Sequence, residues 1–201
     1  MHATTFFVAI PFGVLLIMRA SGARAVTAAS IYAASVLCLF GTSGAYHRLA
    51  HTPSARRVMR RLDHAMIFVL IGGTYTPICL LALPPNWGIP MLVLATVGSI
   101  SGLILKLAAF DRLQRLAYVL YPLLGWIMVI AMPKLIDQLR TAELALIVIG
   151  GLVYSLGLPV LVTRRPNPWP LKFGYHEVWH TCVVIASGCH FAAVGLLVAK
   201  P

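Results

Sequence analysis

Long uncharged hydrophobic stretches are the feature that most constrains this chain. Sixty per cent of the 201 residues are hydrophobic and 10% are charged, against about 25% charged in soluble domains. A helix needs roughly 20 apolar residues to cross the hydrocarbon core of a bilayer. Seven runs meet or approach that length, at about 4–18, 26–46, 64–83, 88–105, 116–133, 143–163 and 175–198. We therefore predict an all-α integral membrane protein, a single seven-helix domain over 1–201, with short connections.

The first run also admits another interpretation, a cleaved signal peptide. Ala23-Arg24-Ala25 has the small-x-small form of a cleavage site. A signal peptide begins with positive charge, and Met1-His2 supplies no Lys or Arg. We interpret the run as a retained span.

The distribution of Lys and Arg predicts the orientation of these spans. Basic residues in short loops are retained on the cytoplasmic side. The connections after spans two, four and six carry eleven of the sixteen: Arg48, Arg56, Arg57, Arg60, Arg61, Lys106, Arg112, Arg115, Arg164, Arg165 and Lys172. This predicts a cytoplasmic N-terminus and an external C-terminus. The formal charge of +11 is then a topology signal, and nucleic acid is not expected as a partner because no basic stretch carries interleaved aromatics.

A few polar side chains fall inside the predicted spans, where a titratable group is costly and therefore a candidate for function. They lie at the cytoplasmic ends of spans two, three and seven, which were assigned from hydrophobicity and from Lys and Arg alone. Three helix ends from distant parts of the chain thus bring polar groups to one side of the bilayer. The residues are Ser43, His47, Asp63, His64, His176, Glu177 and His180.

Three of these histidines have the spacing of a metal site. His176 and His180 are four residues apart and share one helix face. With His47 they make three imidazole ligands and leave a fourth position open, as in catalytic zinc (Zn²⁺) sites. The alternative is that all three are interfacial histidines bonded to carbonyls or lipid headgroups.

The acidic residues are candidates for the proton acceptor. His176-Glu177-Val178-Trp179-His180 reads as HExxH, in which the glutamate is the general base. Glu177 is either that base, a partner of a ligand, or a residue at the wet interface. Asp63 competes for the role of base and has a helix N-cap as its alternative. His190 lies about 15 Å beyond His180 along a helix and is expected to pack elsewhere; His2 and His51 receive no role.

The motifs resemble those of the bacterial haemolysin III family. They are Ser43-Gly44-Ala45-Tyr46-His47, Leu62-Asp63-His64 leading to Ile71-Gly72-Gly73-Thr74-Tyr75-Thr76-Pro77, and His176-Glu177-Val178-Trp179-His180 leading to His190-Phe191. That family is related to the progestin and adipoQ receptors and, more distantly, to the alkaline ceramidases. The resemblance implies a bacterial cytoplasmic-membrane protein with zinc held by His47, His176 and His180. It also implies an aspartate at Asp63 that holds the zinc-bound water, and it places the motif serine at Ser43.

These observations favour a zinc-dependent hydrolase of an amide or ester in a membrane lipid, with catalytic candidates Asp63, Ser43 and Glu177. A zinc-containing receptor-like or homeostasis protein without turnover is the alternative, and the sequence indicates no oligomeric state. A pore is disfavoured because no span has a regular polar face. Two classes of intramembrane protease fit the sequence poorly. A rhomboid-like Gly41-Thr42-Ser43-Gly44 leaves three histidines unexplained, and an HExxH protease with Asp63 as third ligand leaves His47 idle.

Overall fold

The computed structural model describes residues 1–110, 112–170 and 172–199. The regular elements of the described part are all helical. Seven helices or joined helices are long and apolar enough to cross a membrane, which confirms the predicted fold class. The elements are α1 (His2–Arg19), α2 (Gly22–Leu49), α3 (Pro53–Pro77), the π-helical turn η1 (Ile78–Ala82), α4 (Pro85–Ala108), α5 (Gln114–Trp126), the 3-10 segment η2 (Ile127–Ala131), α6 (Met132–Gln138), α7 (Thr141–Thr163) and α8 (Tyr175–Val198).

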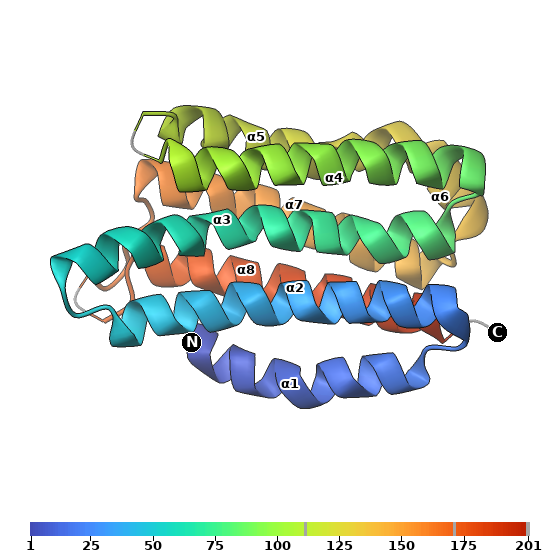
Figure 1. Ribbon diagram of the computed structural model, residues 1–201, viewed down its shortest axis with the longest axis horizontal. Coiled ribbons are helices and arrows are strands. Elements are labelled where there is room, and N and C mark those ends of the chain that lie inside the picture. The colour runs from blue at the N-terminus through green and yellow to red at the C-terminus, as the bar shows by residue number, and fades with distance from the viewer. Residues whose placement is uncertain (111, 171, 200–201) are drawn as a thin grey trace.

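The helices run back and forth along the long axis of the molecule (Figure 1). The first residue lies at one end and the last helix finishes at the other. The end at which the chain begins also carries the α2–α3, α4–α5 and α7–α8 connections. We call it the histidine end. It is the end that the sequence assigns to the cytoplasm.

Helix α3 begins eleven residues earlier than the predicted span that starts at 64. The Thr52 hydroxyl accepts a hydrogen bond from the Ala55 N–H at 3.2 Å, and Pro53 occupies the first turn. Both are strong helix-start signals. The hydrophobicity criterion missed this start because the first turns of α3 are rich in arginine. Helix α8 has the predicted limits, and the remaining spans extend theirs by a few residues at one or both ends.

The fifth span is one apolar run but not one regular helix. The Tyr75 hydroxyl of α3 donates to the Leu124 carbonyl at 2.6 Å and accepts from the Met128 N–H at 2.9 Å. In an α-helix those two backbone groups would bond to each other. The tyrosine therefore stands in for one helical hydrogen bond where α5 passes into η2. In lipid such groups must be satisfied by the protein, so this hydroxyl makes the break possible.

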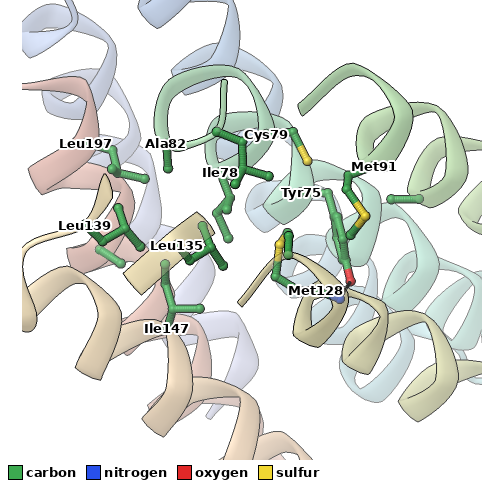
Figure 2. Packing of buried hydrophobic residues seen from close by; sticks show 14 residues of the cluster. Tyr75, Ile78, Cys79, Ala82, Met91, Met128, Leu135, Leu139, Ile147 and Leu197 are labelled. Atoms are coloured by element: carbon green, nitrogen blue, oxygen red, sulfur yellow. Dashed lines mark hydrogen bonds between the residues drawn. The ribbon is translucent and has the colours of Figure 1, made fainter. Parts of the chain in front are cut away.

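Apolar side chains fill the end of the bundle opposite the histidine end. Figure 2 shows this cluster, in which Tyr75 and Cys79 meet Met91 and Met128, with Leu135 further along. All five are at most 7% exposed. This part of the bundle therefore packs as an apolar core.

Candidate metal centre

Three imidazoles from two helices converge at the histidine end. His47 comes from the last turns of α2, and His176 and His180 come from the first two turns of α8. The His176 Nε2 lies 3.3 Å from the His47 Nε2 and 2.9 Å from the His180 Nε2. One ligand nitrogen from each ring lies within 4.8 Å of the other two. The three histidines predicted to act together are therefore brought together, in a group that could hold a metal ion.

Hydrogen bonding alone satisfies this arrangement poorly. A neutral imidazole nitrogen carries either one proton or one lone pair. The His176 Nε2 faces two other Nε2 atoms, so it can pair with only one of them. A cation at the centre accepts a lone pair from all three rings at once. The donor set, three neutral nitrogens, is the one that zinc and similar divalent metals take in proteins.

Ser43 and Asp63 lie beside this group. Ser43 is 2% exposed and sits one helical turn from His47 on α2. The Asp63 carboxyl of α3 is within hydrogen-bonding reach of the Ser43 hydroxyl. Asp63 lies about 15 Å along α3 from Pro53, and Thr52 caps that helix. The alternative interpretation of Asp63 as an N-cap is therefore wrong, and its placement against Ser43 needs another explanation.

Glu177 is engaged at the start of α8. Its Oε2 accepts a hydrogen bond from the Gly174 N–H at 2.9 Å. A carboxylate in the first turn of a helix satisfies a free N–H and interacts favourably with the helix dipole. Glu177 therefore orders the turn that carries His176, a role that the sequence did not predict.

His2, to which the sequence assigned no role, is part of the same cluster. Its Nδ1 lies 2.8 Å from the Ser43 Oγ, and its ring centroid lies 3.7 Å from that of His180. The residue is 6% exposed. No sequence signal marked it, because it precedes the first apolar run and forms no spacing with another ligand. Only the packing of α1 against α2 and α8 reveals it.

The remaining histidines lie elsewhere. The His64 ring packs edge-on against Phe110 at 5.3 Å. The His190 Nε2 bonds to the Ile147 carbonyl at 3.2 Å, and His51 is exposed. Lys106, counted among the loop cations, instead lies within α4, fully buried, with its Nζ 4.5 Å from the centroid of the Phe110 ring.

An apolar cavity of about 200 Å³ lies between α3, α5, α7 and α8. Trp179, the neighbour of His180 in sequence, is one of its lining residues. The lining is mostly hydrocarbon, with the polar groups of Tyr154, Ser155 and His190 among it. Cavity and histidine group therefore share helix α8.

Comparison with known proteins agrees with this architecture. A family model described as "Haemolysin-III related" matches residues 1–191. The chain is 30% identical over 196 residues to "Hemolysin-3 homolog" of Bacillus subtilis (strain 168), covering 96% of this chain and 89% of that one. It is 30% identical over 196 residues to "Hemolysin-3" of Bacillus cereus, covering 96% and 86%. It is also 25% identical over 182 residues to "Adiponectin receptor protein" of Drosophila melanogaster, covering 82% of this chain and 41% of that protein. The chain belongs to the haemolysin III family.

Proposed function

We propose that this protein is a zinc-dependent hydrolase that cleaves an amide or ester bond of a membrane lipid at the cytoplasmic interface. The observation that carries the proposal is the convergence of three Nε2 atoms from α2 and α8. Three histidines with an open fourth position are the ligand set of catalytic zinc. When bound, the metal supplies a water with a pKa of about 7 and a Lewis acid for a carbonyl.

The chain's own residues would supply the proton transfers. The Asp63 carboxylate, to which the Ser43 hydroxyl bonds, would accept the proton of the attacking water. The Ser43 hydroxyl would donate its one proton to that carboxylate and so orient it. Glu177 fixes the first turn of α8 and with it the direction of His176.

The apolar cavity supports a lipid as substrate. Its hydrocarbon lining suits an acyl chain, and Trp179 connects it along α8 to the ligands His176 and His180. The headgroup would then remain at the interface, where the arginines of the histidine end are exposed.

The first experiment is the metal content of the purified protein in detergent, by elemental mass spectrometry. We expect about one zinc per chain, lost in His47→Ala, His176→Ala and His180→Ala and retained in the exposed-loop control His51→Ala. The metal-containing protein is then incubated with N-acyl and O-acyl lipids, and released fatty acid is measured. A parent chain that stays metal-free after reconstitution with zinc contradicts the proposal.

The two helices that carry the ligand histidines also favour a second function. The ligands join α2 to α8, so a metal there would also cross-link the two helices without any turnover, as in a receptor-like or homeostasis protein. Full zinc occupancy together with no release from any lipid of the panel would favour that function. A dye-release assay in liposomes tests pore formation, for which we expect no signal.

A further inference from the structure

The buried imidazole of His2 is a feature that the hydrolase proposal does not use. It is 6% exposed and lies between Phe40 and Ser43 of α2 and His180 of α8. Burying a polar ring of this kind is costly unless its nitrogens are bonded. Its Nδ1 meets the Ser43 hydroxyl at 2.8 Å. Its Nε2 is buried and has no hydrogen-bond partner among the described residues.

The neighbours of Ser43 determine which nitrogen of His2 carries the proton. A serine hydroxyl has one proton to donate. An ionised Asp63 only accepts, so the Ser43 proton points to Asp63. The Ser43 oxygen must then accept from His2, which places the His2 proton on Nδ1. Its Nε2 is left with a bare lone pair at the wall of the histidine group.

The packing of α1 makes this placement possible. Gly44 faces the backbone of Ala3, and a Cβ on Gly44 would lie 3.0 Å from the Ala3 Cα. The missing side chain lets the first turn of α1 lie directly on α2. His2 then stacks on His180 at 3.7 Å between ring centroids and meets Phe40 edge-on at 5.0 Å.

We propose that His2 is a positioning residue of the metal centre, which holds Ser43 toward Asp63 through its Nδ1–H and fixes the ring of His180 by stacking. The inference rests in part on the proposed function, because its energetic readout is metal binding. Partners that orient ligands typically change metal affinity by about 10–100-fold.

The order of the hydrogen-bonded side chains, His2 to Ser43 to Asp63, also distinguishes this positioning role from the role of histidine in a serine hydrolase. In a catalytic triad the acid orients the histidine and the histidine accepts the serine proton. Here the acid lies against the serine, so the serine proton is already committed. Labelling of Ser43 by a fluorophosphonate would overturn the inference in favour of a nucleophilic serine.

The test uses three substitutions of His2 in the full-length protein. An Asn amide places an N–H near the position of Nδ1, whereas a Gln amide reaches the position of Nε2. We expect His2→Gln and His2→Leu to lose zinc to a chelator about 10–100-fold faster than the parent. His2→Asn keeps a donor for Ser43 but loses the ring that lies against His180, so it should fall between these two variants and the parent, and the exposed-loop control His51→Leu should match the parent. A Gln variant that matches the parent while the Asn variant fails contradicts a role through Nδ1.

Two further measurements separate positioning from general stability. In Co²⁺-substituted protein, His2→Gln should change the visible absorption bands, which report the coordination geometry. The same change added to Ser43→Ala should alter the bands less than it does in the parent. Equal changes in both backgrounds would show that His2 does not act through Ser43.

The proton on His2 can be read without any metal. In ¹⁵N-histidine-labelled protein, with the His2 signal assigned from its absence in His2→Leu, we expect the proton on Nδ1. Ser43→Ala should remove this preference. A proton on Nε2 in the parent overturns the inference, whether or not the protein binds zinc. A parent that binds no metal but shows the Nδ1 proton contradicts the proposed function and the role of His2 at a metal centre, and retains only the hydrogen-bonded chain of His2, Ser43 and Asp63.

Discussion

At the residue scale, Asp63 is the group on which turnover depends in the proposed reaction. We expect Asp63→Asn to retain zinc, because the three Nε2 ligands are untouched, and to lose lipid hydrolysis by about 10²–10⁴-fold, the usual contribution of a general base. Metal content and fatty acid release on one preparation check both parts. Hydrolysis at the parent rate would show that Asp63 is not the proton acceptor.

Tyr75 stabilises the fold by standing in for a helical hydrogen bond. Tyr75→Phe leaves the Leu124 carbonyl and the Met128 N–H without this bridge. We expect a loss of about 1–3 kcal/mol in the free energy of unfolding, measured by denaturant titration in detergent. Tyr175→Phe is the control, since no hydrogen bond of its hydroxyl occurs within the described residues, and it should unfold like the parent.

The sequence predicted the three metal-ligand candidates because each carries a local signal. Titratable residues in apolar runs are rare, and the spacing of His176 and His180 places them on one face. His2 carries no such signal. Its role depends on the approach of α1 to α2 at Gly44, which is a property of packing between helices. Lys106 was misplaced for a related reason, because aromatic rings of neighbouring elements bury it within α4.

At the scale of the elements, close helix contacts rest on glycines. A Cβ on Gly73 of α3 would overlap the Ser35 side chain of α2. We expect Gly73→Ala to lower the free energy of unfolding by about 1–3 kcal/mol through overpacking. Gly188→Ala on α8 meets nothing within 4 Å and should be neutral or slightly stabilising. Equal stability of the two variants would show that α2 and α3 have room to separate.

The presence of each membrane-spanning helix was predictable from the sequence, whereas the residues at which the helices begin and end were less predictable. The apolar runs predicted seven spans because membrane helices require length and low charge. The start of α3 lay outside that criterion, although Thr52-Pro53 carries a capping signal. The break between α5 and η2 is bridged by the hydroxyl of Tyr75, a residue about fifty positions away, and the sequence of the span does not reveal this partner.

At the scale of the whole molecule, the cavity offers a direct test of the lipid substrate. Gly151 lines it, and a Cβ there meets no atom within 4 Å. Gly151→Leu should occupy part of the cavity, keep the zinc, and reduce hydrolysis of long-acyl lipids more than of short-acyl lipids. Gly188→Leu, an exposed position with open space, is the control. Undiminished long-acyl turnover would place the acyl chain elsewhere.

The orientation is a second prediction at this scale. Eleven of the sixteen basic residues were assigned to the side of the histidine end, which predicts that this end is cytoplasmic. A C-terminal alkaline phosphatase fusion should be active in a bacterial host, and a C-terminal green fluorescent protein fusion should be dark. The opposite pair of results would place the metal centre outside.

The ligands are also separated in the order of synthesis. His47 lies 129 residues before His176, and chains are made and folded from the N-terminus. A metal ion bound by all three rings can therefore arrive only after the last helix has been inserted. Metal binding would then join two segments that lie far apart in the sequence, and the chain between them would lose conformational freedom. Metal binding would be the last step of assembly. A chain that ends before α8 would insert six spans but would lack two of the three ligands.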